Sequence, residues 1–207
     1  MIAPAHLEGF GAIEQVAAAK AEILSGLGRK GIFYVNNDDP RCVRIAETFD
    51  GEVVRFGLSG DVRLCGREIL PSGETRLAID PVGRITLPLP CPAHAVHVLL
   101  AVAVCMRHGV EEFEGALRQA LETTARFRVV RIGPWEVLDD TYNANPASMK
   151  AALEALEART IAGFRVAALG DMLELGAASR ELHRELGRQA AGYGVSHVFA
   201  YGTFAGE

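Results

Sequence analysis

Residues 139–146 (DDTYNANP) hold the densest group of side chains that could do chemistry. Two aspartates and two asparagines stand there between a β-prone run and a helix-like run. A chain reversal needs only one or two residues of this kind, so their number favours a binding site over a simple turn. A carboxylate in this place can accept hydrogen bonds from the hydroxyl groups of a ribose.

Lys20 is the second candidate. It shares one helical stripe with four apolar residues, Ile13, Val16, Leu24 and Leu27. This spacing predicts an amine in the middle of an apolar face. One interpretation is a lysine whose stem covers apolar surface while its amine reaches water. The other is chemical, because desolvation favours the neutral amine. A neutral amine can capture carbon dioxide as a carbamate, whose oxygens suit Mg²⁺. The sequence alone leaves both interpretations open.

Two further groups have the side chains of metal ligands. His6 and Glu8 precede the Lys20 segment, and beside a carbamate they would form a corner for a hard cation. A lone histidine is otherwise a surface or packing residue. Cys91, His94 and His97 are spaced by three, which is compatible with zinc. A proline interrupts that segment and the rest resembles a core helix, so packing is the favoured interpretation there.

Phosphate-binding motifs are weak or absent. Residues 26–31 (GLGRKG) match G-x-G-x-x-G, but they close a helix, whereas the dinucleotide fingerprint follows a strand and opens a helix. A helix end followed by a loop is therefore the favoured interpretation. The sequence contains no G-x-x-x-x-G-K-[ST]. Arg126 suits phosphate because its guanidinium donates two parallel hydrogen bonds, and a structural ion pair is the equal alternative.

The composition bounds the class of protein. The 207 residues are 49% hydrophobic and 23% charged, which excludes a disordered or collagen-like chain. The net charge of −5 offers no basic surplus for a nucleic acid. The longest apolar run, 95–106, is shorter than the ~20 residues of a membrane span, and no signal peptide is visible. Four cysteines without a C-x-x-C pair fit reduced thiols. We therefore expect a cytoplasmic protein without a nucleic-acid or membrane partner.

The first 125 residues mix helix-like and β-prone patterns. Apolar spacing predicts a helix at 13–27 and a buried strand at 31–36. Asp39 and Pro40 predict the N-cap and first turn of a helix at 40–48. Gly, Pro and Asp separate four β-prone runs, which we expect to form antiparallel hairpins: 53–57, 62–64, 75–79 and 84–87. Helices are expected at about 93–108 and 111–122.

The pattern beyond residue 125 is a regular alternation. It predicts strands at 126–132, 135–139, 164–169 and 197–201, and helices at 146–158 and 180–192. Pro146 suits the first turn of one helix and Ser179 the cap of the other. Such an alternation implies parallel βαβ units. Ligands of these sheets bind at the carboxyl ends of the strands, where residues 139–145 and 170–172 stand.

Four segments of the chain resemble the Mur ligase family, and within it the branch that adds D-alanyl-D-alanine to the peptidoglycan precursor. They are residues 5–11 (AHLEGFG) with 19–23 (AKAEI), 36–40 (NNDDP), 139–149 (DDTYNANPASM), and 170–176 (GDMLELG) with His183. The similarity runs along the whole chain.

The resemblance implies an α/β fold in two parts. Residues 1–125 would be the second half of the central ATP-binding domain, with antiparallel hairpins. Residues 126–207 would be an incomplete Rossmann-like βαβαβ C-terminal domain of the glutamate-ligase type. Family members have three domains, so the N-terminal domain, the P-loop and the C-terminal end are expected to be missing from this sequence. We expect residues 1–125 to expose apolar surface and residues 133–207 to be the better-formed part.

The resemblance also implies a reaction of peptidoglycan synthesis, and so a role in cell wall biogenesis, cell shape and cell division. ATP would phosphorylate the terminal carboxylate of UDP-N-acetylmuramoyl-tripeptide. The amine of D-alanyl-D-alanine would then attack the acyl phosphate. Mg²⁺ would offset the charge of the phosphates. A monomer is expected.

Roles carry over to individual residues only through this resemblance. Lys20 resembles a carbamylated lysine, and His6 resembles its Mg²⁺-binding neighbour. The residues expected on the nucleotide side are Asn36, Asp38, His94, Arg126 at the hinge, and Asp140 at the ribose. Those expected on the acceptor side are Asn143, Asn145 and Asp171.

The sequence departs from the family at the adenine-side motif. A Gly-x-His-Asn-x-x-Asn pattern is replaced here by residues 92–98 (PAHAVHV), so Ala95 and Val98 stand where amides are expected. Each lost hydrogen bond to a buried partner costs about 1–3 kcal/mol. These replacements suggest relaxed nucleotide contacts. Because the phosphate cradle and the nucleotide-sugar domain are not encoded in this sequence, we expect the isolated chain to be inactive. The alternatives are a non-catalytic binding module and another amide ligase of the superfamily, of the folate-polyglutamate type.

Overall fold

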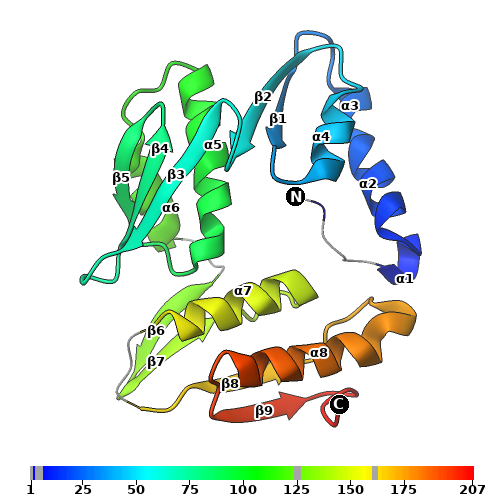
Figure 1. Ribbon diagram of the computed structural model, residues 1–207, viewed down its shortest axis with the longest axis vertical. Helices are drawn as coiled ribbons and strands as arrows, with labels where there is room; N and C mark the ends of the chain where they lie inside the picture. Colours follow the sequence, from blue (N-terminus) through cyan, green and yellow to red (C-terminus); the bar gives the residue numbers. More distant parts are fainter. Residues whose placement is uncertain (1, 3–6, 124–126, 160–162) are drawn as a thin grey trace. The chain divides into compact units, whose positions relative to one another are not determined.

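The computed structural model describes residues 2, 7–123, 127–159 and 163–207 (Figure 1). These residues fall into two compact units. The first consists of Met1–Ile2, Ala17–Leu89 and Ala93–Thr124, and the second of Ala3–Val16, Pro90–Pro92 and Ala125–Glu207, in each case without the residues outside the described ranges. The domain boundary at 125/126 stays a prediction of the sequence.

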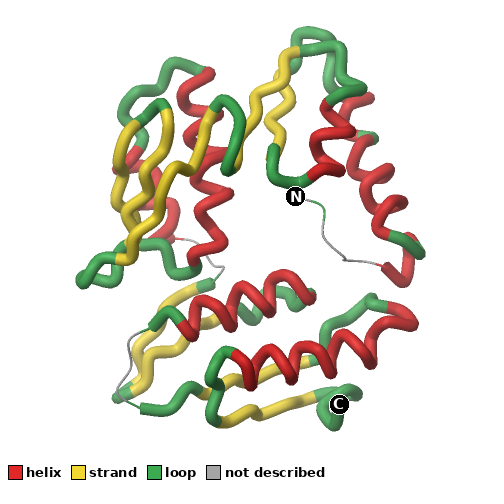
Figure 2. Tube along the Cα trace, in the orientation of Figure 1, coloured by secondary structure: helices red, strands yellow, loops and turns green. Residues whose placement is uncertain are grey.

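A five-stranded sheet forms the centre of the first unit (Figure 2). Its strands follow chain order: β1 (Ile32–Asn36), β2 (Glu52–Gly57), β3 (Val62–Ile69), β4 (Thr75–Asp80) and β5 (Gly83–Leu87). The predicted antiparallel hairpins are confirmed for β3, β4 and β5. The prediction is wrong for β2, which pairs in parallel with both β1 and β3. Helix α4 (Pro40–Ala46) connects β1 to β2, and a crossover of this kind permits parallel pairing.

The start of α4 follows its sequence signature. Asp39 is the N-cap, and its Oδ1 accepts a hydrogen bond from the Arg41 N–H at 3.0 Å. Pro40 occupies the first turn, where its missing N–H costs nothing. Burial of Asp39 raises the pKa of its carboxyl, but the hydrogen bonds from the Ile2 and Arg41 amides outweigh this and leave the pKa below its ordinary value.

The predicted helix at 13–27 is divided. The chain forms α1 (Leu7–Phe10), α2 (Ile13–Ala21) and α3 (Ile23–Gly26), with a break at Glu22. Val16 is buried, at 3% exposure, but Lys20 is exposed. The exposed Lys20 fits the interpretation in which its stem covers apolar surface while its amine reaches water.

The larger core lies between the sheet and two helices of the first unit. These are α5 (Ala95–Arg107), which begins after the short helix η1 (Pro92–His94) and contacts β1, β2 and β3, and α6 (Glu114–Thr123), which contacts β5. Leu77, Leu87 and Val102 are fully buried. Burying each such side chain contributes about 1.5–3 kcal/mol.

The second unit carries the predicted alternation of strands and helices. In chain order it has β6 (Arg128–Ile132), β7 (Trp135–Asp139), α7 (Pro146–Glu157), β8 (Val166–Gly170), η2 (Gly176–Ala178), α8 (Ser179–Gly192) and β9 (His197–Tyr201). β6 and β7 form an antiparallel hairpin, and β8 and β9 pair in parallel across α8. The parallel βαβ prediction is thus confirmed for β8 and β9. In the described part of the chain, no ladder joins β7 to β8.

Ser179 does not cap α8 as predicted. It is the first residue of the helix, no side chain caps the preceding Ala178, and the Ser179 hydroxyl donates to the Gly176 carbonyl at 2.8 Å. The chain enters α8 directly from η2, so the preceding residues are already helical and the serine lies one position too late to cap.

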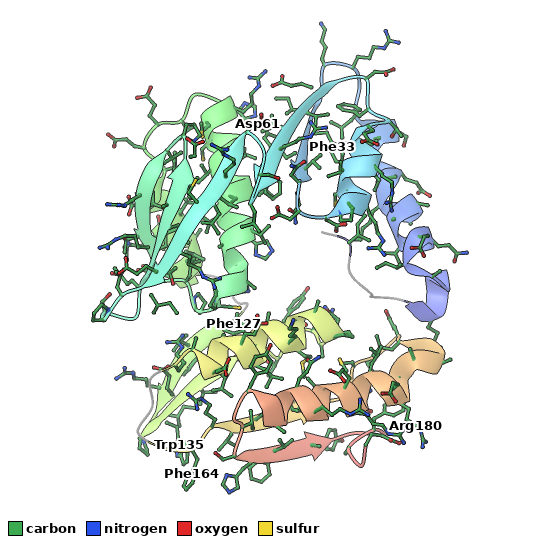
Figure 3. All side chains as sticks on the ribbon, in the orientation of Figure 1. Phe33, Asp61, Phe127, Trp135, Phe164 and Arg180 are labelled. Atoms are coloured by element: carbon green, nitrogen blue, oxygen red, sulfur yellow. The ribbon has the colours of Figure 1, made fainter. Side chains whose placement is uncertain are left out.

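The cores of the second unit are smaller. α7 and α8 lie side by side over a cluster of Leu153, Met172, Leu175, Leu186 and Ala190. A second cluster consists of Cys91, Phe127 and Ala155. Trp135 and Phe164 are more than half exposed (Figure 3), and every residue of β9 is exposed. When the two units are compared by the size of their buried cores, the expectation that residues 133–207 are the better-formed part is wrong, because the larger core belongs to the first unit.

Candidate functional site

The acidic loop of the second unit begins at the carboxyl end of β7. The Asp139 carboxylate pairs with Arg128 at 2.6 Å and accepts hydrogen bonds from the hydroxyl and the N–H of Thr141 at 2.7 and 3.2 Å. The Thr141 hydroxyl, followed by Arg128, lowers the pKa of Asp139 to about 2. Asp139 therefore stabilises the turn as a permanent anion. Asp140, the predicted ribose ligand, follows it and is half-buried.

The two asparagines of this loop differ in their use. Asn145 is the N-cap of α7, and its Oδ1 accepts from the N–H groups of Ala147 and Ser148 at 3.1 and 3.0 Å. The Ser148 hydroxyl accepts in return from the Asn145 N–H at 3.1 Å, which completes a capping box. Asn143 is exposed, and its Oδ1 accepts from the Ala144 N–H at 2.9 Å. The helix thus occupies the Asn145 oxygen, and Asn143 lies at the surface.

Asp171 stands at the carboxyl end of β8 and is half-buried. Its carboxylate accepts from the Thr203 N–H at 2.7 Å and from the Phe204 N–H at 3.1 Å. Gly202 approaches this carboxylate so closely, with φ of 125°, that a side chain there would collide with it. The carboxylate therefore anchors the segment after β9, and its predicted contact with the acceptor stays a prediction.

The loop after β8 also contacts α1. The Glu8 N–H donates to the Glu174 carbonyl at 3.0 Å. Glu174 and Gly176 both have left-handed backbones, with φ of 61° and 59°. Two of the segments that resemble the Mur ligases thereby meet within the second unit. His6 lies outside the described residues, as does Arg126.

The predicted nucleotide ligands of the first unit take part in its loops. Asn36 is buried at the end of β1, and its Oδ1 accepts from the Asp38 N–H at 3.0 Å. The Asp38 carboxylate accepts from the Leu58 N–H at 2.8 and 3.0 Å, and a side chain at Gly57 would come within 2.7 Å of it. The Asn36 side chain therefore shapes the turn after β1, and the Asp38 carboxylate joins this turn to the end of β2.

His94 is half-buried at the start of α5, and its ring lies 5.5 Å from that of His97. Burial lowers the pKa of His94, and His97 lowers it further. Ala95 and Val98, which replace the expected amides, are each 4% exposed and belong to the core of the first unit. These two positions therefore pack α5 against the sheet.

A metal site is not formed by the residues that the structure describes. Within those ranges, no three His, Cys, Asp or Glu side chains converge on one point. Cys91, His94 and His97 form no such group. Lys20 is exposed, and a carbamate there stays a prediction of the sequence.

The sequence analysis missed the structural use of Asn145 and Asp171. A detectable signal existed for Asn145, because Pro146 and Ser148 follow it in the spacing of a capping box. No local signal marks Asp171, since its partners lie 32 and 33 residues away.

Models of two protein families match the chain: the Mur ligase middle domain at residues 1–105 and the Mur ligase glutamate ligase domain at residues 125–206. The chain is 32% identical over 207 residues to UDP-N-acetylmuramoyl-tripeptide–D-alanyl-D-alanine ligase of Haemophilus influenzae, covering 98% of this chain and 45% of that relative. It therefore spans less than half the length of the curated relatives it matches.

Two solved structures extend the comparison. The first is MurF from Acinetobacter baumannii, with a TM-score of 0.85 and 31% identity over 98% of this chain and 46% of that chain. The second is a MurF ligase from Thermotoga maritima in complex with ADP, with a TM-score of 0.82 and 24% identity over 96% of this chain and 50% of that one; this likeness shows the fold. In the described part of our chain, no helix is long and apolar enough to cross a bilayer.

Proposed function

Because the chain belongs to the Mur ligase family, we propose that it serves the ATP-dependent ligation of D-alanyl-D-alanine to UDP-N-acetylmuramoyl-tripeptide. The observation that carries this proposal is the 32% identity over 98% of the chain to a curated ligase named for that reaction. We further propose that the protein acts as a monomer in the cytoplasm, where the nucleotide-linked precursor is made.

The proposed reaction has two chemical steps. The terminal carboxylate of the tripeptide attacks the γ-phosphorus of ATP, which releases ADP and leaves an acyl phosphate. The amine of D-alanyl-D-alanine then attacks the acyl carbon, loses a proton, and expels inorganic phosphate as the amide forms. In this proposal Asp140 holds the ribose of ATP. The exposed Asn143 lies on the same loop and faces the acceptor.

The described residues do not fit a Mg²⁺ site. Lys20 is exposed, no three His, Cys, Asp or Glu side chains of the described residues converge on one point, and His6 lies outside those residues. We therefore derive no step that depends on a metal ion or on a carbamate at Lys20.

The 207-residue chain by itself is proposed not to turn over. It contains no G-x-x-x-x-G-K-[ST] segment that could cradle the ATP phosphates. A phosphate-release assay with ATP, the UDP-linked tripeptide and D-alanyl-D-alanine tests this. Background release is expected from the chain alone, and sustained release above it would contradict the proposal of inactivity.

A non-catalytic binding module is the second candidate function. It is favoured by Ala95 and Val98, which lie in the core where hydrogen-bonding amides are expected in the family. Titration calorimetry separates the two candidates. Binding of ATP or of D-alanyl-D-alanine tighter than about 1 mM supports retention of ligase chemistry. Absence of both binding events supports the binding module.

A further inference from the structure

His183 contacts its own helix and two other segments of the second unit. It lies in the first half of α8 and is buried, with 9% exposure. Its Nδ1 lies 2.6 Å from the Ser179 carbonyl, and the Met172 N–H donates to its Nε2 at 2.9 Å. The ring of Phe204 stacks on the imidazole with centroids 4.6 Å apart.

These contacts determine which nitrogen carries the proton. A carbonyl only accepts hydrogen bonds, so Nδ1 must donate to Ser179. A backbone N–H only donates, so Nε2 must be the unprotonated acceptor for Met172. The imidazole is therefore neutral with its proton on Nδ1. The Asp171 carboxylate, 3.9 Å from Nε2, is already occupied by the N–H groups of Thr203 and Phe204.

The position of the loop after β8 depends on this arrangement. Met172 and Leu175 are buried at 1% and 2% exposure, whereas Leu173 between them is 73% exposed. These buried side chains hold the loop against the core of the second unit. Because they are apolar, they make no hydrogen bond that would orient its backbone. The hydrogen bond from the Met172 N–H to His183 orients the backbone at the start of the loop, and the Glu8 N–H binds the loop further along, at the Glu174 carbonyl.

We propose that His183 is a positioning residue, which in its neutral Nδ1–H form holds residues 170–175 in the conformation that faces the amino acceptor. The acceptor part of this statement rests on the proposed function. The positioning part rests on the contacts of His183 alone.

A matched pair of substitutions separates the two hydrogen bonds of the imidazole. The side-chain oxygen in His183→Gln can reach the place of Nε2 and accept from Met172. The amide nitrogen in His183→Asn matches Nδ1 and donates to Ser179, but the side chain is too short to reach Met172. Both variants are polar and neutral and keep the helix.

The first measurement is amide hydrogen exchange of Met172 in the ligand-free 207-residue chain. We expect exchange in His183→Asn to be about tenfold faster than in the original chain, and exchange in His183→Gln to stay within about threefold. The ¹⁵N chemical shifts of the His183 ring should show a protonated Nδ1 and a free Nε2. Equal Met172 exchange in the two variants, or a proton on Nε2, would overturn the proposal.

The second measurement is an NMR titration with D-alanyl-D-alanine. Weaker binding to His183→Asn than to His183→Gln supports the positioning role. Equal binding despite faster exchange refutes that role. If the original chain does not bind the dipeptide, the acceptor assignment of the proposed function fails, and the exchange and ring-shift data still decide whether His183 positions the loop.

Discussion

Replacing Asn145 by alanine removes the cap of α7. The substitution deletes the two hydrogen bonds from the Ala147 and Ser148 N–H groups, at 3.1 and 3.0 Å. The Ser148 hydroxyl keeps its partners, because it bonds the backbone N–H and carbonyl of residue 145. Loss of an N-cap costs about 0.5–2 kcal/mol. Because Asn145 is half-buried, water replaces the lost acceptor only in part, and we expect about 1 kcal/mol. For a unit of about 100 residues this lowers the Tm by about 4–8 °C.

The chain supplies a specific probe for this experiment. Its single tryptophan, Trp135, lies in β7 of the second unit. Thermal unfolding followed by tryptophan fluorescence therefore reports on the unit that contains α7. Asn143→Ala is the matched control. Asn143 is exposed, and its side chain accepts a hydrogen bond from the adjacent Ala144 N–H rather than from the first turn of a helix. Its expected cost is below about 0.5 kcal/mol.

A double substitution tests whether the capping box acts as a unit. Ser148→Ala removes the hydroxyl that accepts from the Asn145 N–H. If the two side chains cooperate, the double variant should lose less stability than the sum of the single variants, by about 0.5 kcal/mol or more. Equal Tm values for Asn145→Ala and Asn143→Ala would refute the reasoning, since the cap would then contribute nothing beyond a surface asparagine.

Three further substitutions test other parts of the fold. The pKa of Asp139 is about 2 in the folded chain against about 3.9 in an unfolded one, so its stabilisation is complete above about pH 4 and is lost as the pH falls toward 2. Asp139→Asn should flatten this acid dependence in tryptophan fluorescence, and an unchanged profile would contradict it. Gly202→Ala should force the segment after β9 away from Asp171 and speed its amide exchange, whereas Gly206→Ala, which has open space around it, should not; equal exchange would count against the anchor. Leu77→Ala, at a fully buried position, should cost about 2–5 kcal/mol in urea unfolding followed by circular dichroism, and a cost below 1 kcal/mol would show that the core of the first unit is loose.

The elements of the second unit could be predicted because their patterns are local. Pro146 marks the start of α7, and the apolar runs of β7, β8 and β9 are bounded by turn residues. The pairing of β2 could not be obtained in this way. A short β-prone run has the same composition in a hairpin and in a parallel pair. The crossover through α4 permits the parallel pairing of β1 with β2, but no local pattern marks the parallel pairing of β2 with β3.

The position of the candidate site in the fold could be predicted from the sequence, but the availability of its side chains to a ligand could not. The residue types at 139–145 and 170–172 mark the carboxyl ends of β7 and β8, where they do lie. Whether a carboxylate is available to a ligand depends on which backbone amides it already binds, and for Asp171 those amides come from the far end of the unit. For Lys20 the helical spacing left two interpretations open, and the exposed side chain fits the one in which the amine reaches water.

The exposed strand β9 has a consequence for the behaviour of the chain in concentrated solution. Its sequence, HVFAY, lacks lysine, arginine, acidic residues and proline, and in the described residues it pairs with β8 alone. An uncharged edge of this kind is a template for strands of other molecules. Aggregation through β9 should therefore set the upper concentration at which the protein can be handled, and a single lysine at Val198, which is 48% exposed, should raise that limit.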